Sequence, residues 1–554
     1  MLSDHEIARA AALKPIGEIA DALAIDPKHR MPFGTDMCKI HADALAEPTQ
    51  RKGQLILVSA TTPTPAGEGK TTTSIGLGQG FQAIRESVAI ALREPSLGPC
   101  FGVKGGATGG GYAQMVPADR INLHFTGDFH AITSANNLIA AMLDNSLFQG
   151  NPHGLDPRRV LWRRVMDMND RALRNIVMGL GGKMQGVPRE GGFDITAASE
   201  IMAIVCLSRD LDDLAQRLDN ILLGFSYDGE PVRAGALKIT GALLALLKDA
   251  MYPNLVQTLE GVPVFVHGGP FANIAHGCNT LLATRMAMHH ADWAITEAGF
   301  GFDLGAEKFF DIKCRAGGLD PAAVVLVTTV RALKSHGGQA RDALETPAPE
   351  HVAAGLTNLD KHLESAAVFG KKPVVAINRF AADTDEEIAV IRAHVEAAGY
   401  RVAESRHFAE GGPGSADLAR EVIASVQDNE PLRFAYEADD PLPEKISKVA
   451  RAIYGASGVV FTKEAEKDLA DFAAAGLDRL PVCIAKTPAS LSDNPALLGR
   501  PEGFEITVRN VQVSAGAGFL VALTGTILRM PGLPKSPQAL RVRLNSDGSV
   551  EGVA

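Results

Sequence analysis

The sequence is poor in aromatic residues and in long apolar runs, and its cysteines are not paired. Its 554 residues include 22 Phe, 6 Tyr and 2 Trp. The six cysteines are widely spaced and form no CxxC pair, so a zinc framework built on cysteine is not expected. No run approaches the roughly 18 apolar residues of a membrane span. These absences argue against a cysteine-rich or membrane-embedded protein and favour a reducing, cytoplasmic location.

Concentrated positive charge is also missing. The net charge is −10, and the chain has neither a basic tail nor a lysine-rich stripe. Nucleic acid binding normally requires such charge, so we expect no nucleic acid partner and no membrane partner. With 46% hydrophobic and 21% charged residues, the chain is long enough for two or three domains with sizeable cores. The N-terminal segment lacks the apolar stretch of a signal peptide.

One segment has the order strand, glycine-containing loop, helix. The apolar run at 54–60 is followed by TTPTPAGEGKTTT at 61–73. Backbone N–H groups of such a loop and of the helix start converge on a phosphate. Lys70 adds positive charge for the outer phosphates, and the Thr71 hydroxyl can reach Mg²⁺. The predicted nucleotide-binding residues are Thr64, Pro65, Ala66, Gly67, Glu68, Gly69, Lys70, Thr71 and Thr72.

The loop departs from the usual phosphate-binding pattern at one position. That pattern places a glycine five residues before the Gly-Lys pair, and Thr64 stands there instead. An ordinary turn between strand and helix is the alternative interpretation. Two prolines, two glycines and a Lys-Thr pair after a buried strand favour an anion-binding loop. The sequence therefore predicts phosphate binding with a different entry into the loop.

Short β-branched runs alternate with alanine-rich helical stretches over most of the chain. This pattern predicts an α/β fold, with a P-loop NTPase-like large domain whose sheet is mostly parallel. Composition suggests that this domain covers 1–355, followed by a small α/β domain at 356–440 and a mixed α/β domain at 441–554. Residues 158–250 are expected to be predominantly helical. After 54–60, the expected strand regions are 87–95, 262–270, 291–301, 322–330 and 372–380.

Polar residues gather where the predicted strands end, and parallel sheets bind ligands at that edge. Arg93 ends the second strand region and can hold an oxyanion through two N–H groups. A surface ion pair with a nearby acid is the alternative interpretation for Arg93. Glu94 can bind a cation or balance the arginine, and Asp128 is a second candidate cation ligand.

Two further segments are rich in glycine. Residues 102–111 contain six glycines and are flanked by Phe, Tyr and Met rather than serine. This composition favours close approach of the backbone to a ligand or another chain over a flexible linker, and Lys104 adds positive charge there. His267 and His276 follow another strand without metal-ligand spacing, so we expect both to satisfy backbone groups. We expect no metal site made only of protein ligands.

Taken together, these features resemble the formate–tetrahydrofolate ligase (formyltetrahydrofolate synthetase) family over nearly the whole chain. KGGATGGGY and VRALKSHGG are highly specific to that family, and Thr64 is itself part of the family's loop. The strongest matching motifs are PTPAGEGKTT, REPSLGPCFGVKGGATGGGYAQMVPADRINLHFTGD, HGGPFANIAHGCNT, TEAGFGFDLGAEKFFDIKCR, VRALKSHGG and MPGLPK.

The resemblance implies a reaction and a set of ligands. ATP, formate and tetrahydrofolate would give 10-formyltetrahydrofolate, ADP and phosphate through formyl phosphate. Lys70 and Arg93 would be catalytic, with Arg93 holding the formyl phosphate. ATP would bind with Mg²⁺ at Thr71, and a monovalent cation (K⁺ or NH₄⁺) would bind at Glu94 and Asp128. The family resemblance also implies a homotetramer.

The folate side of the family's site matches less well. The family stacks the pterin between aromatic rings, and Phe380 and Phe408 correspond to them. Ala381 replaces a proline and Phe408 a tryptophan, which leaves a smaller face for stacking. Residues 488–489, Pro-Ala, replace a Gln-Tyr pair in the family's KTQYSLSD motif. Core roles for both rings are the alternative interpretation.

Two other functions remain open on the residues alone. Another P-loop ligase or ATPase that activates a carboxylate as an acyl phosphate would account for the loop and Arg93. It would leave the dense glycine segment and the two phenylalanines unexplained. A nucleotide-dependent switch without turnover on a small substrate is the other possibility. ADP release that requires both formate and tetrahydrofolate would separate the ligase from both.

Overall fold

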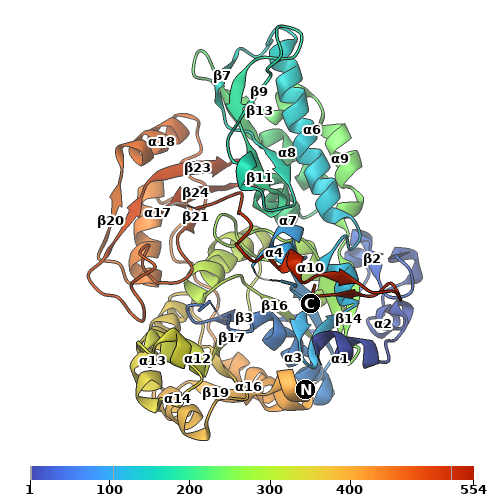
Figure 1. Ribbon diagram of the computed structural model, residues 1–554, viewed down its shortest axis with the longest axis vertical. Coiled ribbons are helices and arrows are strands. Elements are labelled where there is room, and N and C mark those ends of the chain that lie inside the picture. Colours follow the sequence, from blue (N-terminus) through green and yellow to red (C-terminus); the bar gives the residue numbers. More distant parts are fainter. Residues whose placement is uncertain (1–2, 66, 104, 526, 554) are drawn as a thin grey trace.

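The computed structural model describes residues 3–65, 67–103, 105–525 and 527–553. Strands and helices alternate over most of the chain around one large mixed sheet, so the α/β prediction is confirmed (Figure 1). Among the described residues the sheet has 12 strands. Its order is β1-β2-β14-β15-β4-β16-β3-β17-β18-β19, with β6 paired to β14 and β5 to β6.

In the order of the sheet, the seven strands from β15 to β19 are parallel to one another. At the other side, β1, β2 and β14 are joined by antiparallel pairs, and β14 is also antiparallel to β15. The expected strands in 54–60, 87–95, 262–270, 291–301, 322–330 and 372–380 are confirmed as β3, β4, β15, β16, β17 and β18. The strands are β1 (Arg30–Pro32), β2 (Cys38–Ile40), β3 (Gln54–Ala60), β4 (Val88–Leu92), β5 (Gly109–Gly110), β6 (Ala113–Val116), β14 (Asn254–Thr258), β15 (Pro263–Val266), β16 (Trp293–Glu297), β17 (Ala323–Thr328), β18 (Val374–Asn378) and β19 (Arg401–Ser405).

Both faces of the central strands are buried, which explains their continuous apolar sequences. Successive residues of a strand point to opposite faces. Leu55 and Leu57 of β3 belong to one core cluster together with residues of α10 (Leu281–His290). Ile56 and Val58 belong to another, which contains residues of α3 (Lys70–Ala83). Helices α10 and α3 therefore cover opposite faces of the sheet.

Further helices surround the sheet (Figure 1). They are α1 (Asp4–Ala10), α2 (Ile16–Ala22), α4 (Leu97–Phe101), α5 (Ala118–Asn122), α11 (Arg315–Gly317), α12 (Val330–His336), α13 (Pro349–Val368), α14 (Asp385–Ala397), α15 (His407–Glu410) and α16 (Ala416–Ser425). The suggested boundary at residue 355 lies inside α13, and β18 and β19 beyond it continue the same sheet. The division into three domains stays a prediction.

Residues 128–251 project from the large sheet at the top of Figure 1. The prediction that 158–250 is predominantly helical holds only in part: α-helices occupy 200–207, 211–220 and 240–247, whereas short strands pair within 158–195 and 222–233. Helix-forming composition is a weak preference that tertiary pairing overrides. The elements are α6 (Asp128–Phe148), β7 (Leu155–Val160), β8 (Arg164–Met166), β9 (Ile176–Met178), β10 (Arg189–Gly191), β11 (Phe193–Ile195), α7 (Glu200–Leu207), α8 (Leu211–Asn220), β12 (Leu222–Ser226), β13 (Pro231–Arg233) and α9 (Thr240–Leu247).

The C-terminal part contains two small sheets, one parallel and one mixed. After β24 the chain returns towards the large sheet, where it ends in a short hairpin (Figure 1). The elements are α17 (Leu442–Val449), β20 (Gly458–Phe461), α18 (Lys463–Ala474), β21 (Val482–Ala485), β22 (Glu505–Val508), β23 (Asn510–Ser514), β24 (Phe519–Leu523), β25 (Arg543–Leu544) and β26 (Val550–Glu551).

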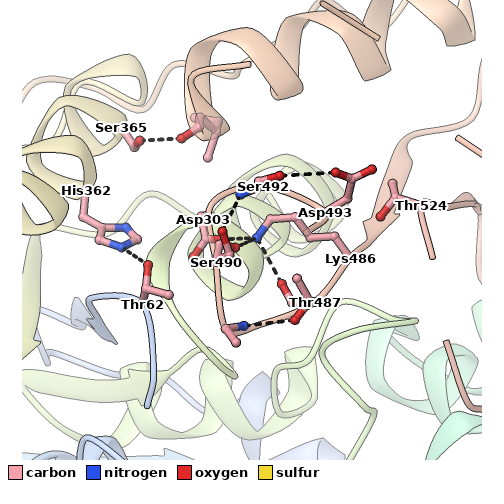
Figure 2. Close-up of polar contacts among 12 residues, drawn as sticks. Thr62, Asp303, His362, Ser365, Lys486, Thr487, Ser490, Ser492, Asp493 and Thr524 are labelled. Carbon is pink, nitrogen blue, oxygen red and sulfur yellow. Dashed lines mark hydrogen bonds and ion pairs between the residues drawn. The ribbon is translucent and has the colours of Figure 1, made fainter. Parts of the chain in front are cut away.

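A buried ion pair fastens the C-terminal part to the large sheet. Lys486 follows β21, and its Nζ lies 2.6 Å from Asp303 Oδ2, with both side chains fully buried (Figure 2). Lys486 Nζ also donates to the Ser490 carbonyl at 2.5 Å. Nearby, the Thr62 hydroxyl lies 2.9 Å from His362 Nε2 of α13. Because Asp303 follows β16, the ion pair with Lys486 attaches the C-terminal part at the carboxyl edge of the sheet.

Two compositional expectations concern the chain as a whole. The six cysteines are free and buried. None of the described helices is both long and apolar enough to cross a membrane.

Candidate active site

The predicted site residues lie along one edge of the sheet because parallel strands place their carboxyl ends together. The predicted phosphate-binding loop follows β3, Arg93 follows β4 and Phe380 lies shortly after β18. Glu297, the last residue of β16, pairs with Val58 of β3, which places its side chain beside the loop. Sequence segments from four different parts of the chain therefore meet at this edge.

The loop at 61–69 is held in shape by the buried carboxylate of Glu68. Its Oε1 accepts hydrogen bonds from the Thr64 amide and hydroxyl, at 2.8 and 2.9 Å. Its Oε2 accepts a bond of 2.6 Å from the hydroxyl of Thr329 at the start of α12. Asn378 at the end of β18 donates to the Glu68 carbonyl at 3.1 Å. Thr64 thus closes the loop through a hydroxyl that a glycine at that position would lack.

The backbone of the loop needs glycine where it enters α3. Gly67 and Gly69 have φ values of +77° and +69°, which side-chain-bearing residues rarely adopt. A Cβ on Gly69 would also meet the amide of Asn378. Pro65 and Gly67 are exposed, whereas Lys70 and Thr72 are partly buried at the start of α3. Ala66, also predicted to bind nucleotide, lies outside the described residues.

A buried glutamate, which the sequence analysis did not select, connects the loop to Arg93. Glu297 Oε2 accepts a hydrogen bond of 2.9 Å from the Thr71 hydroxyl. Glu297 Oε1 lies 3.5 Å from Arg93 Nη2. The Glu297 side chain is only 4% exposed, so this is not the surface ion pair considered for Arg93. The signal available in the sequence was an acid at the end of an apolar run; that this run lies next to β3 is seen only in the structure.

Arg93 keeps unused donor capacity. Its Nε is buried and has no hydrogen-bond partner among the described residues. Its side chain is 22% exposed, so part of the guanidinium remains accessible. A Cβ on Gly299 would lie 2.9 Å from Arg93 Nη1, so the bare backbone at Gly299 leaves room for the guanidinium. An arginine with open donors at this edge is suited to a small anion.

Glu94 and Asp128 lie close together and are both buried. Asp128 is already neutralised: Lys39 Nζ lies 2.6 Å from its Oδ1, and Asn254 donates to its Oδ2 at 2.8 Å. Glu94 Oε2 has no partner among the described residues. Burial, with a further contribution from the Asp128 carboxylate, raises the pKa of Glu94 well above its ordinary value. Glu94 is therefore the acid in this pair that lacks a balancing cation.

The glycine segment makes close contacts with other parts of the same chain. A Cβ on Gly106 would collide with the Val553 carbonyl, and one on Gly111 would collide with the Phe408 carbonyl. The close contacts are therefore with the chain itself, and the expected approach of a ligand or another chain stays a prediction. Lys104, which was expected to add charge there, lies outside the described residues.

The two candidate folate-stacking rings have different surroundings. Phe408 of α15 is 39% exposed, so its ring is accessible. Phe380 is partly buried, and the Arg331 guanidinium lies 4.0 Å from its ring centroid. The backbone carbonyl of Ser405, just before α15, accepts a hydrogen bond of 3.1 Å from the Arg379 amide. The segments that carry the two rings are therefore adjacent. Their role in folate binding stays a prediction.

The two histidines after β15 differ. His267 is satisfied as expected, with Nδ1 2.8 Å from the Thr280 hydroxyl and Nε2 2.7 Å from the Ala250 carbonyl. The expectation for His276 is wrong, because both its ring nitrogens are buried without a hydrogen-bond partner among the described residues. Burial, reinforced by Lys313 and Arg93, lowers the pKa of His276 to about 3, so the ring is neutral. Among the described residues, no cluster of His, Cys, Asp or Glu can hold a metal ion by itself.

A model of the formate–tetrahydrofolate ligase family matches residues 2–554, which is almost the whole chain and includes all the candidate site residues described above. The chain belongs to the formate–tetrahydrofolate ligase family. Two relatives named formate–tetrahydrofolate ligase, from Maricaulis maris (strain MCS10) and Symbiobacterium thermophilum, are each 56% identical over 556 residues, with 100% of both chains covered. Membership of the formate–tetrahydrofolate ligase family confirms the resemblance drawn from the motifs. It favours an enzyme over a nucleotide-dependent switch.

Proposed function

We propose that this chain joins formate to tetrahydrofolate with ATP, giving 10-formyltetrahydrofolate, ADP and phosphate. The observation that carries the proposal is the contact of one buried carboxylate, Glu297, with both Thr71 and Arg93. It joins the loop suited to nucleotide phosphates to an arginine suited to a second small anion. A ligase that activates formate needs these two sites side by side.

In the first step, a formate oxygen attacks the γ-phosphorus of ATP, and ADP leaves. The P-loop NTPase-like loop at 61–69 and Lys70 would hold the phosphates through backbone N–H groups and the ammonium group. The oxygen ligands at Thr71 and Glu297 fit Mg²⁺, which prefers carboxylate and hydroxyl oxygens. When bound, this ion neutralises the charge of the phosphates. The protein's own contribution is to position the reactants and stabilise charge.

In the second step, the N10 amine of tetrahydrofolate attacks the formyl carbon, and phosphate leaves as the amine loses its proton. Arg93 would hold formyl phosphate through its open N–H groups and stabilise the oxyanion that forms during the attack. One such preorganised donor contributes about 3 kcal/mol to transition-state stability. Thr71 and Arg93 meet at Glu297, so the phosphoryl group need not travel between the two steps.

A monovalent cation, K⁺ or NH₄⁺, would bind at Glu94. The unpartnered Oε2 of Glu94 fits such an ion, because the oxygen is buried and carries no balancing charge. Asp128 would contribute less than the sequence suggested, since Lys39 already contacts it at 2.6 Å. The cation would keep Glu94 ionised next to Arg93.

Tetrahydrofolate would lie on the aromatic side of the edge, with its pterin against Phe408 and Phe380. The exposed ring of Phe408 and the contact between the segments that precede the two rings support this placement. Phe408 lies beside the helix that begins at Lys70: a Cβ on Gly76 of α3 would collide with His407. Gly76 is six residues beyond Lys70, or about 9 Å along the helix axis. Phosphate and folate sites are therefore within reach of one substrate pair.

We further propose a cytoplasmic homotetramer, as the family resemblance implies. Exposed apolar side chains on the hairpin formed by β9 and β10 support a contact between subunits. Val177 is 58% exposed, Leu180 65% and Met184 74%. Exposed apolar groups gathered in one short segment are typical of a protein–protein contact.

Two substitutions test the proposed chemistry. Lys70→Ala and Arg93→Ala should each abolish detectable 10-formyltetrahydrofolate while the circular dichroism spectrum and melting temperature stay close to those of the wild type. Lys467→Ala, on the surface of α18 with 74% of its side chain exposed, serves as a control and should retain full activity. A folded Lys70→Ala or Arg93→Ala enzyme with near-normal formyl transfer would remove that residue from the mechanism.

A further inference from the structure

We propose that Asp4, in the N-terminal helix α1, is a positioning residue for the folate side of the site. It would act through the glycine hairpin formed by β5 and β6, which in turn holds Phe408. This inference rests on the proposed folate role of Phe408. It assigns a function to the N-terminal helix, more than a hundred residues from the hairpin in sequence.

Asp4 fixes the tip of the hairpin through the main chain. Its Oδ1 accepts a hydrogen bond of 2.8 Å from the Gly111 amide. The side chain of Gln114 donates both to the Asp4 carbonyl at 3.0 Å and to the Gly111 carbonyl at 2.7 Å. Gly111 has φ +57°, a conformation that favours glycine, and its amide has hydrogen-bond support from outside the hairpin. The first turn of α1 supplies that support.

The opposite side of the same tip holds Phe408. The Tyr112 amide donates a hydrogen bond of 2.9 Å to the Phe408 carbonyl. A Cβ on Gly110 would lie 3.1 Å from Cε2 of the Phe408 ring and 3.2 Å from Asp4 Oδ2. The hairpin tip is thus enclosed between the Asp4 carboxylate and the Phe408 ring. A displacement of the tip would be transmitted directly to the ring.

The remaining contacts of α15 favour transmission through the hairpin. His407 packs against Gly76 of α3, and the Gly412 amide donates to Glu260 at 2.8 Å. These contacts fix the two ends of the short segment that carries Phe408. Between those ends, the hydrogen bond from the Tyr112 amide ties the Phe408 carbonyl to the hairpin, in addition to the hydrogen bonds of the turn itself. Helix α1, which carries Asp4, is stabilised independently of the hairpin, because Ser3 and Glu6 form a capping box at its start.

The first test compares three variants in steady-state kinetics. Asp4→Ala removes the acceptor of the Gly111 amide and should raise the Michaelis constant for tetrahydrofolate about threefold to tenfold. The Michaelis constants for ATP and formate should stay within about twofold. Asp4→Asn keeps a side-chain oxygen acceptor and should restore most of the loss. Arg9→Ala, on the same helix with 57% of its side chain exposed, should behave as the wild type.

Equal increases for ATP and tetrahydrofolate in Asp4→Ala, or no increase for either, would overturn the inference. Failure of Asp4→Asn to restore the value would also overturn it. These readouts distinguish positioning from a loss of overall stability, which would reduce the amount of active enzyme and leave the Michaelis constants unchanged.

A double-mutant cycle separates this inference from the proposed role of Phe408. If Asp4 acts through the ring, Asp4→Ala combined with Phe408→Ala should have the same Michaelis constant for tetrahydrofolate as Phe408→Ala alone. Multiplied effects of the two substitutions would refute transmission through Phe408 while leaving the folate role intact. A Phe408→Ala enzyme with an unchanged constant for tetrahydrofolate would instead overturn the folate role, and the inference with it.

Discussion

At the scale of single residues, Glu297 determines the geometry of the candidate site. One carboxylate contacts the Thr71 hydroxyl at 2.9 Å and Arg93 at 3.5 Å. A carboxylate so deeply buried is stable only with partners of this kind. Without its negative charge, Thr71 at the start of α3 and Arg93 after β4 would no longer share a charged partner. Glu297 therefore deserves the same experimental priority as Lys70 and Arg93.

Glu297→Gln should lower kcat about 10-fold to 100-fold and raise the Mg²⁺ concentration needed for half-maximal activity. The amide keeps the size of the side chain but removes the charge that attracts Arg93 and Mg²⁺. Asp292→Asn, just before the other end of the same strand, provides the control and should leave both quantities unchanged. Wild-type kcat and Mg²⁺ dependence in Glu297→Gln would show that the carboxylate is only structural.

At the scale of elements, the sequence predicts the central strands of the large sheet well and the short strands outside that sheet poorly. Apolar runs such as 54–60 and 322–330 are unambiguous because both faces of a central parallel strand are buried. Within 158–250 the expected helices are found at 200–220 and 240–247, but the short strands at 158–195 and 222–233 were missed, since their conformation depends on pairing with other strands. Local pattern therefore identifies the loop after β3 but not the elements that surround it.

The contacts of the candidate site likewise join segments that are far apart in the sequence. Arg93 was selected because it follows an apolar run, and the structure places it beside the loop as parallel strands require. Glu297 and the contact between Asp4 and Gly111 were not selected. Each joins segments more than a hundred residues apart, and no spacing in the sequence encodes such a contact. No residue pattern around His276 indicates that its ring nitrogens would lack hydrogen-bond partners.

At the scale of the whole molecule, the projecting part, the C-terminal part and the large sheet are joined by buried charged groups. Lys486 and Asp303 join the C-terminal part to the sheet. Glu200 of α7 joins it to the projecting part, by accepting hydrogen bonds from the Gly516 and Ala517 amides at 2.7 and 3.3 Å. Burial raises the pKa of Glu200 to about 7, although those two hydrogen bonds act in the opposite direction. The stability of this junction should therefore depend on pH.

The sign of that dependence follows from the raised pKa of Glu200. Below its ordinary value of 4.5 the carboxyl is protonated in the folded and unfolded chains alike. As pH rises towards 7, the unfolded chain releases the proton first, so the folded state loses stability until the folded carboxyl also ionises. Glu200→Gln removes this loss. It should raise the free energy of unfolding by up to about 3 kcal/mol at pH 8 and by much less at pH 5.

Urea unfolding at pH 5 and pH 8 checks this prediction, with the exposed Glu190→Gln as a control expected to show no difference. A Glu200→Gln protein that is equally affected at the two pH values would show that Glu200 does not titrate as described.

The central claim is that this chain couples the cleavage of ATP to ADP and phosphate, through transfer of the phosphoryl group to formate, to the joining of formate and tetrahydrofolate at one edge of its sheet. Its most direct test measures ADP and 10-formyltetrahydrofolate in the purified enzyme, with each substrate omitted in turn and then with K⁺ and NH₄⁺ removed. The account predicts equal amounts of the two products when all substrates are present, little ADP when formate or tetrahydrofolate is missing, and reduced turnover without the cation. Steady ADP release without formate and tetrahydrofolate, or ADP without the formylated product, would contradict it.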